Sequence, residues 1–281
     1  MATQEIALVL GGGGARGIAH VHVLQAFDDL GIKPCVIAGS SIGAVFGAGY
    51  AAGMSAALIR QYCISTFGKK SEVMARLWRL RPESLASFIS GGLPRVGEFN
   101  AQKVMRAFLP REIPDRFEDL ELPLKVTVTD FFGGSLAVLE KGDLYQALAA
   151  SSAIPVVFKP EIIDGRVYVD GGLSSPVPFD LVMVPGRLVV AVDVVGMPRG
   201  RERNMPTRIE AAFGASQLMM QTITRMQLDK HQPDLLVRPA VNDYRVLDFL
   251  RAEHILKHTE ATRIEVRTGL EKLLNPKRRT G

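Results

Sequence analysis

The sequence predicts an α/β fold with a mainly parallel central sheet and helices on both faces of that sheet. Twice near the N-terminus, a short apolar run is followed by a glycine-rich loop and then by a helical pattern, an arrangement typical of parallel sheets. Residues 188–195 form a continuous apolar run, as expected for a strand buried on both faces. The 281 residues are 47% apolar and 22% charged, which is enough for one domain with a large aliphatic core.

The two N-terminal units are predicted from apolar periodicity and glycine loops. Residues 5–10 read as a strand that ends at four glycines. Apolar residues at positions 18, 21, 24 and 27 predict an amphipathic helix over residues 16–30, which Gly31 ends. The second unit comprises a strand over residues 36–38, a loop over 39–43 and a helix of small residues over 42–52.

Residues 68–123 differ from this pattern, because basic and aromatic residues are mixed there with poor periodicity. We expect a helical insert over the sheet, with a hinge at residues 90–94. A lid or substrate-entry region is one interpretation, and a simple surface elaboration is the other.

The second half of the chain returns to regular patterns. Residues 124–129 predict a strand, residues 132–139 its hairpin-like return, and residues 162–170 a hairpin that turns at Asp164 and Gly165. A helix is predicted over residues 209–228, with Met219, Met220 and Met226 as core filler. A last strand over residues 235–241 closes the sheet, and a charged helix over residues 252–274 packs outside it. We therefore expect a single domain over residues 1–281, with a core over 5–200, the insert over 68–123 and C-terminal helices over 206–275.

Charge and cysteine content narrow the range of partners and compartments. The net charge is +5, but Lys and Arg are spread along the chain, so nucleic acid is not expected as a partner. The basic tail at Lys277, Arg278 and Arg279 is compatible with transient contact with an anionic membrane surface. Cys35 and Cys63 lie in apolar runs and are expected to be reduced. With neither a secretory signal nor a run of about 18 apolar residues, a cytoplasmic location is predicted, with peripheral contact at the inner face of the membrane as an option; the oligomeric state stays open.

The pentapeptide Gly39-Ser40-Ser41-Ile42-Gly43 has the form G-x-S-x-G between a predicted strand and a predicted helix. In that context the serine occupies a strained turn, and the glycines let strand and helix approach each other. The Ser41 hydroxyl then lies at a helix N-terminus, where developing negative charge is favoured. We interpret Ser41 as a candidate nucleophile; the other interpretation is a Gly/Ser loop that only joins two elements.

The glycine loop at residues 11–17 has two interpretations. Gly12, Gly14 and Gly17 fit the dinucleotide-binding pattern G-x-G-x-x-G. That pattern requires an acidic residue at the end of the second strand, where this chain has Ser40 and Ser41 instead. We favour an oxyanion hole, in which main-chain amides converge and Arg16 steadies the loop or the charge.

A nucleophilic serine needs a base, and the sequence offers two kinds of candidate. Asp170 ends a predicted hairpin strand and precedes two glycines, so a partly desolvated carboxylate could activate the serine directly. Among the histidines, His20 is nearest to the glycine loop and remains an alternative base. Asp130 and Asp193 are rival carboxylates, although capping of a loop or helix is the simpler role for each.

Three blocks in this order resemble the signature motifs of patatin-like phospholipases: Gly-Gly-Gly-Ala-Arg-Gly at 12–17, Gly-Ser-Ser-Ile-Gly at 39–43 and Asp-Gly-Gly at 170–172. The run from Ser151 through Phe158 is also similar to the approach to that family's aspartate. The resemblance spans about residues 5–200 and is closest to small bacterial single-domain members. It implies a patatin-like fold, hydrolysis of lipid acyl esters through an acyl-enzyme, and no cofactor or metal. The implied site residues are a Ser41–Asp170 dyad, an oxyanion hole from Gly12, Gly13, Gly14 and Arg16, and supporting glycines Gly39, Gly43, Gly171 and Gly172.

Two departures from the family pattern leave the substrate preference open. Gly11 stands where plant patatins often have Asp, and Ser175 stands where many relatives have Asn. Two alternative functions also stay open at this point. One is a regulatory or scaffolding protein of the same fold with little turnover, and the other is a nucleotide-binding domain. Neither the head group, the acyl length nor the choice between phospholipase, lysophospholipase and esterase follows from the sequence.

Overall fold

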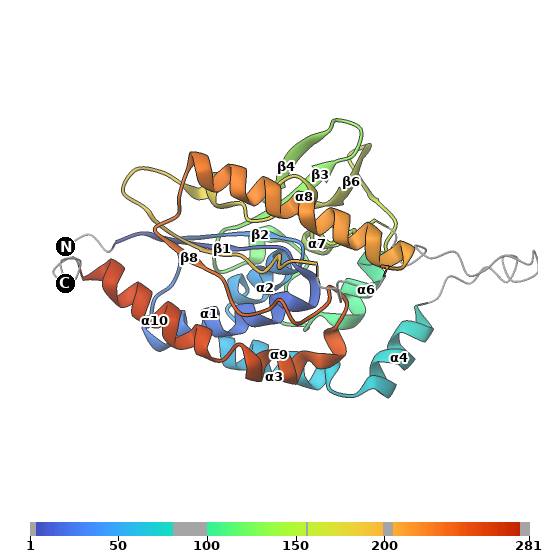
Figure 1. Ribbon diagram of the computed structural model, residues 1–281, viewed down its shortest axis with the longest axis horizontal. Helices are drawn as coiled ribbons and strands as arrows, with labels where there is room; N and C mark the ends of the chain where they lie inside the picture. The colour runs from blue at the N-terminus through green and yellow to red at the C-terminus, as the bar shows by residue number, and fades with distance from the viewer. Residues whose placement is uncertain (1–3, 81–99, 156, 199–204, 276–281) are drawn as a thin grey trace, which may run out of the picture.

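A sheet of eight strands forms the centre of the computed structural model, which describes residues 4–80, 100–155, 157–198 and 205–275 (Figure 1). Seven of these strands lie in the order β5-β6-β3-β2-β1-β7-β8, and β4 pairs with β3 beside that path. Their bounds are β1 Ile6–Leu10, β2 Val36–Ser40, β3 Leu124–Asp130, β4 Ser135–Leu139, β5 Glu161–Ile163, β6 Arg166–Asp170, β7 Leu188–Val192 and β8 Leu235–Val237.

The central strands are parallel, as the sequence predicts. β1 pairs in parallel with β2 and β7, β2 with β3, and β7 with β8, whereas β4, β5 and β6 run antiparallel to their partners. The register brings Leu10 level with Gly39 on one side and with Val192 on the other. Because parallel strands end at the same edge of a sheet, the segments after β1, β2 and β7 meet there.

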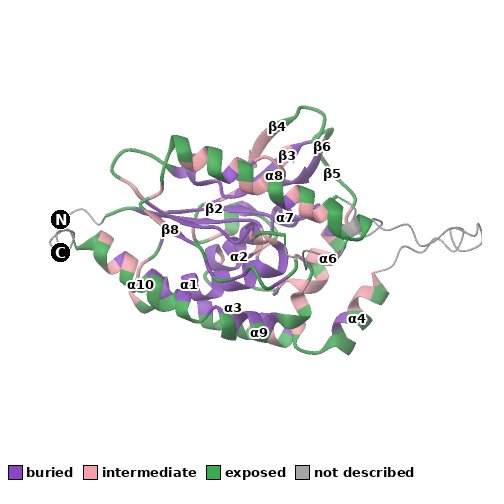
Figure 2. Ribbon diagram, viewed as in Figure 1, coloured by how far each residue is buried: buried purple, intermediate pink, exposed green. Residues whose placement is uncertain are grey.

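Helices cover both faces of the sheet, which confirms the predicted fold class. Alternate residues of β1 belong to two cores: Ile6, Leu8 and Leu10 pack in the larger core, and Ala7 and Val9 in the smaller one. The larger core includes side chains of α1 His20–Asp29, α2 Ile42–Ala51, α3 Ala56–Phe67, α7 Leu144–Ser151, α9 Ala252–His258 and α10 Ala261–Leu274. The smaller core is covered by α8 Arg208–Lys230 and the 3-10 turn Phe179–Val182, and Figure 2 shows the buried strands between these layers.

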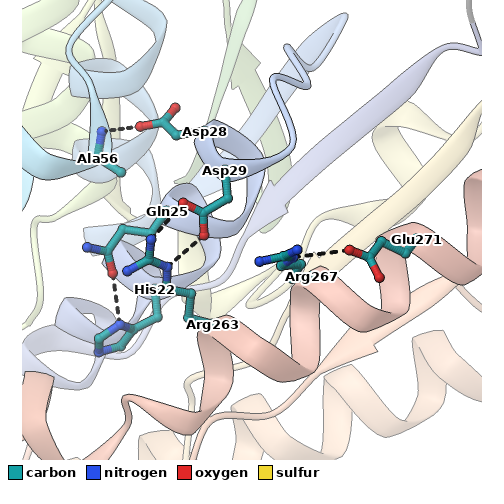
Figure 3. Close-up of polar contacts among 8 residues, drawn as sticks. All are labelled: His22, Gln25, Asp28, Asp29, Ala56, Arg263, Arg267 and Glu271. Carbon is teal, nitrogen blue, oxygen red and sulfur yellow. Dashed lines mark hydrogen bonds and ion pairs between the residues drawn. The ribbon is translucent and has the colours of Figure 1, made fainter.

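Helix α1 is fastened to two helices that follow it in the chain (Figure 3). The Arg263 guanidinium on α10 donates to both carboxylate oxygens of Asp29, over 2.7 and 2.6 Å. Asp28 accepts the Ala56 amide at the start of α3 over 2.7 Å. These bonds join α1, α3 and α10 to one another in the helical layer that covers the larger core.

The predicted insert over residues 68–123 contains α4 Lys70–Arg79, α6 Ala101–Phe108 and the 3-10 turn Phe117–Asp119. The expected hinge at residues 90–94 lies outside the described residues. Within the described part of the chain, no helix combines the length and the apolar character needed to cross a membrane.

Several element boundaries differ from the sequence prediction. The helix predicted from residue 16 begins with a 3-10 turn, Gly14–Ala19, because glycines there disfavour a regular α-helix. The helix predicted over residues 252–274 is broken between α9 and α10, where the Thr259 hydroxyl bonds back to the Ile255 carbonyl over 2.8 Å. The strands predicted to reach residues 195 and 241 end at Val192 and Val237. By contrast, the hairpin turn is confirmed at Asp164 and Gly165, which both have positive φ.

The prediction that the α8 methionines are core filler is wrong for two of the three. Met219 and Met226 are each 57% exposed, whereas Met220 packs against the smaller core. α8 has only one side against the sheet, and Met219 and Met226, seven residues apart, lie together on another side.

Candidate active site

Ser41 lies in a strained turn between β2 and α2. Its backbone has φ 52° and ψ −123°, a positive φ that non-glycine residues rarely adopt. Its amide donates to the Ser151 hydroxyl over 2.8 Å, which helps to hold the turn. At Gly43 any side chain would collide with the main-chain oxygen of Leu10, so glycine is required for β1 and α2 to approach. The turn places the Ser41 hydroxyl at the N-terminus of α2.

The Ser41 hydroxyl donates a hydrogen bond to Asp170, with 2.7 Å between Oγ and Oδ2. Asp170 ends β6, and its Oδ1 accepts the Gly172 amide over 2.8 Å. Its main-chain oxygen accepts the Thr129 hydroxyl over 2.9 Å, which fixes the strand end. Both Ser41 and Asp170 are buried. Burial raises the pKa of Asp170 to about 6, and the bonds from Ser41 and Gly172 oppose that rise.

The glycine loop passes directly beside Ser41. A Cβ on Gly12 would lie 3.4 Å from the Ser41 Cβ. The Gly12 amide already donates to the Pro176 carbonyl over 2.9 Å. Among the described residues, no carbonyl or side chain accepts the amides of Gly13 and Gly14. Of the predicted oxyanion donors, these two amides are therefore available to a ligand, and Gly12 is not.

The Arg16 side chain is buried against main-chain carbonyls. Its Nε donates to the Tyr244 oxygen over 2.8 Å, and its Nη1 donates to the Val195 oxygen. Burial lowers the pKa of Arg16 to about 10, so the guanidinium stays charged at neutral pH. The structure thus gives Arg16 the loop-steadying role that the sequence allowed.

A C-terminal segment, residues 241–251, packs against the glycine loop and forms hydrogen bonds with it. The Val246 oxygen accepts the Ala15 amide over 2.7 Å, and it leaves no room for a side chain at Gly14, whose φ is +60°. The Tyr244 hydroxyl contacts the Nδ1 of His254 at 2.7 Å, and the Arg251 guanidinium lies 4.9 Å from the centre of the Tyr244 ring. Sequence reasoning missed this segment, because no local pattern reveals a contact with a loop more than 220 residues earlier.

His20 binds the glycine loop rather than Ser41. Its Nε2 lies 2.9 Å from the Gly11 oxygen, and since a carbonyl can only accept, Nε2 carries the proton. Burial lowers the pKa of His20 to about 4, so the ring is neutral at physiological pH. His22 lies between the Leu256 oxygen and Gln25, the latter contact drawn in Figure 3. None of the five histidines, all of them described, forms a hydrogen bond with Ser41.

The two rival carboxylates have structural partners. Asp130 accepts the Gly133 amide over 2.8 Å and pairs with Arg166, and the Gly133 bond in particular lowers its pKa. Asp193 accepts the Val195 amide and pairs with Arg238. Each holds a loop, as the simpler interpretation of the sequence expected.

Ser41 lies where two cavities meet. The larger, of about 410 Å³, has an almost entirely apolar lining that includes Ile42, Val45 and Gly49 along one side of α2. The smaller, of about 170 Å³, is lined by Asp170, Arg16 and Gln217 among others. Ser41, Gly14 and Ile154 line both. An apolar chamber beside a smaller, more polar one suits an ester with a long acyl chain and a compact leaving group.

In the described part of the chain, no three His, Cys, Asp or Glu residues lie close enough together to hold a metal ion. The site described so far comprises the hydrogen bond between Ser41 and Asp170, the amides of Gly13 and Gly14, and the two cavities.

Comparison with known sequences identifies the family. The family model described as patatin-like phospholipase matches residues 8–183. An NTE family protein of Mycobacterium tuberculosis, named as uncharacterised, is 33% identical over 212 residues, covering 75% of this chain and 55% of that protein. Human patatin-like phospholipase domain-containing protein 6 is 31% identical over 194 residues, and lysophospholipase NTE1 of Yarrowia lipolytica 27% over 280 residues. These two alignments cover 68% and 88% of this chain but only 13% and 18% of the relatives.

The chain thus spans about half the length of the mycobacterial relative and less than a fifth of the other two. Among solved structures, VipD from Legionella pneumophila matches with a TM-score of 0.52 at 15% identity, covering 95% of this chain and 67% of that one. At this identity the match shows a shared fold. The supporting segment at residues 241–251 lies beyond the part that the family model matches.

Proposed function

Because the chain belongs to the patatin-like phospholipase family, we propose that it hydrolyses acyl esters of lipids, with Ser41 as nucleophile and Asp170 as general base. The observation that carries this proposal is the 2.7 Å hydrogen bond from the Ser41 hydroxyl to Asp170, at the junction of two cavities. A relative named as a lysophospholipase supports single-chain lipid esters as the first substrates to test. The single-domain organisation and a cytoplasmic location belong to the same proposal.

In the acylation step, the Ser41 oxygen attacks the ester carbonyl while its proton passes to Asp170. The carbonyl oxygen becomes an anion and takes hydrogen bonds from the amides of Gly13 and Gly14, each worth roughly 2.7–4 kcal/mol if well placed. The protonated Asp170 then gives its proton to the leaving alkoxide, and the alcohol departs. An acyl-Ser41 ester remains, with its chain in the apolar cavity.

In the deacylation step, a water molecule takes the place of the alcohol. Asp170 removes a proton from that water, the hydroxide attacks the acyl-Ser41 carbonyl, and the proton returns to Ser41 as the fatty acid leaves. A carboxylate with a pKa of about 6 suits both directions of proton transfer near neutral pH. Gly39, Gly43, Gly171 and Gly172 support this geometry by letting backbone segments approach; a Cβ on Gly171, for example, would collide with the Thr127 oxygen.

A fluorophosphonate probe, which reacts with activated serines, tests the proposal together with a panel of p-nitrophenyl esters and lysophospholipids. Labelling and hydrolysis are expected in the native protein and in His20→Gln, and are expected to be lost in Ser41→Ala and Asp170→Asn. Labelling without hydrolysis of any ester would favour a scaffolding protein with little turnover. Labelling that survives Ser41→Ala would contradict the proposed nucleophile.

A further inference from the structure

The apolar cavity opens to the outside between α4 and the C-terminal segment. Met74, Leu247 and Leu250 all line the cavity, yet they are 53%, 50% and 42% exposed. These three side chains therefore form part of its rim. Figure 1 shows α4 at one end of the molecule, and Figure 2 shows that most of its surface is exposed.

Helix α4 has an apolar stripe that continues beyond the rim. Val73 and Leu77 line the cavity, and Trp78 follows Met74 by four residues, so that it lies on the same side of the helix. Trp78 is 64% exposed. Large exposed apolar side chains next to an apolar cavity indicate an interaction surface.

Positive charge accompanies this stripe. Lys70 precedes Met74 by four residues, and Arg79 follows Trp78 directly. Both are exposed, and among the described residues neither has an ion-pair partner. The acidic residue of α4, Glu72, is already paired with Lys69 at 2.9 Å. The helix therefore presents exposed apolar groups together with net positive charge.

We propose that Met74, Trp78, Leu247 and Leu250, with Lys70 and Arg79, form a docking surface for an anionic lipid bilayer. Tryptophan partitions into the interface between headgroups and acyl chains, and Lys or Arg beside it meets lipid phosphates. A second copy of this chain fits less well, because facing copies would bring the cations of α4 against each other. Membrane docking itself does not require the proposed function, but its benefit rests on that function. With the rim of the cavity docked on the bilayer, an acyl chain could move from the lipid into the cavity without crossing water.

Trp78 is the only tryptophan of the chain, so its emission reports directly on this surface. Ser41→Ala protein, which binds without turnover, is mixed with vesicles of phosphatidylcholine alone or with added phosphatidylglycerol. With the anionic vesicles we expect the emission to move to shorter wavelength, lipids brominated in their acyl chains to quench it, and the protein to sediment with the vesicles. Unchanged emission and no sedimentation would overturn the proposal, and so would a shift that follows protein concentration without lipid, since that result assigns the surface to a second copy.

Charge variants separate this surface from general basicity. Lys70→Ser/Arg79→Ser keeps Trp78 and is expected to weaken binding to anionic vesicles about fivefold for each cation removed. The matched control is Arg225→Ser/Lys230→Ser, which removes two exposed cations from α8. Equal weakening by both double variants would contradict a specific docking surface.

Hydrolysis assays keep this proposal distinct from the proposed function. In the otherwise native protein, Lys70→Ser/Arg79→Ser should hydrolyse a water-soluble short-chain ester normally but vesicle lipid more slowly. If the native protein hydrolyses the soluble ester yet does not bind vesicles, docking is wrong and the proposed function stands. If it binds vesicles but hydrolyses no ester, the proposed function is wrong and docking stands.

Discussion

The Nε of Arg16 donates a hydrogen bond of 2.8 Å to the main-chain oxygen of Tyr244, a residue 228 positions further along the chain. This bond joins the glycine loop to a segment beyond the part matched by the family model. It also explains how a loop rich in glycine, and hence intrinsically mobile, is held against Ser41. We therefore expect the position of the Gly13 and Gly14 amides, the proposed oxyanion donors, to depend on the C-terminal part of the chain.

Arg16→Met tests this dependence. The variant removes the donor to Tyr244, whereas the Val195 oxygen keeps a bond of 3.1 Å from Gln217. The unpaired Tyr244 oxygen should cost about 1–3 kcal/mol of unfolding free energy. A displacement of the loop by about 1 Å should lower kcat by up to about 100-fold, with KM little changed.

Steady-state kinetics and urea unfolding measure these two effects. Arg245→Met is the matched control, because Arg245 lies in the same segment and its largely exposed side chain pairs, within the part of the chain that the structure describes, with Glu210 alone. The control should behave as the native protein does. Native kcat in Arg16→Met would show that the loop needs no such anchor.

Asp170→Asn is expected to abolish activity and yet to stabilise the fold at alkaline pH. The pKa of Asp170 in the folded protein, about 6, lies above its ordinary 3.8, so the folded state binds the proton more tightly than the unfolded chain does. Ionisation therefore lowers stability as the pH rises from about 4 to about 6, by about 3 kcal/mol in full. An asparagine can still accept from Gly172 and lie beside the Ser41 hydroxyl without this burial of charge.

Chemical denaturation at pH 8 and below pH 4 checks whether ionisation of Asp170 lowers the free energy of unfolding. The variant should exceed the native protein in unfolding free energy at pH 8, and the difference should vanish below pH 4. Asp193→Asn provides the contrast, since that carboxylate is paired with Arg238 and its loss should not stabilise the protein. If the Asp170→Asn protein were less stable than the native one at pH 8, burial of the charged Asp170 carboxylate would not destabilise the fold.

The pH dependence of kcat/KM distinguishes the two candidate bases. Only ionised Asp170 can accept the Ser41 proton, so activity should fall as the pH drops through about 6. His20 has a pKa of about 4, so its titration cannot produce this acidic limb of the pH profile, the fall in kcat/KM near pH 6. In His20→Gln the new amide can donate to the Gly11 oxygen, and the limb should stay near pH 6. Loss or displacement of the limb in this variant would make His20 the base.

Local patterns were sufficient to predict the sheet and to single out Ser41 and Asp170, which the structure joins by a hydrogen bond. G-x-S-x-G and Asp-Gly-Gly mark places where backbone geometry demands glycine, and such demands are visible in sequence: a side chain at Gly43 would collide with Leu10, and one at Gly171 with Thr127. The hydrogen bond between Ser41 and Asp170 then follows from strand pairing, since Asp170 lies opposite Val128 on the strand next to β2.

What the sequence could not reveal depends on long-range contacts and partial burial. Pairing of Gly12 with Pro176 and of Arg16 with Tyr244 has no local signature, so neither the engaged amide nor the buried guanidinium could be foreseen. Apolar periodicity likewise does not say which side of a helix meets the core, and for this reason the core prediction is wrong for Met219 and Met226. The partly exposed rim of the apolar cavity, at Met74, Leu247 and Leu250, is likewise not visible in apolar periodicity.

The course of the apolar cavity along α2 predicts a graded effect on acyl-chain length. Val45 and Gly49 line it at one and two turns beyond Ser41, or about 6 and 12 Å along the helix. A larger side chain at the nearer position should exclude more of the chain. Val45→Phe should therefore restrict hydrolysis to shorter esters than Gly49→Val does, and an added Cβ at Gly49 meets only ordinary contacts with Met54 and Ile59.

A series of p-nitrophenyl esters of increasing chain length measures this effect. Each methylene that no longer enters the cavity should lower kcat/KM about fourfold, the equivalent of about 0.8 kcal/mol. The acetyl ester serves as the internal control, because its short chain does not reach either position and its hydrolysis should change little. If both variants lost the same chain lengths, or lost the acetyl ester as well, the acyl chain would not run beside α2.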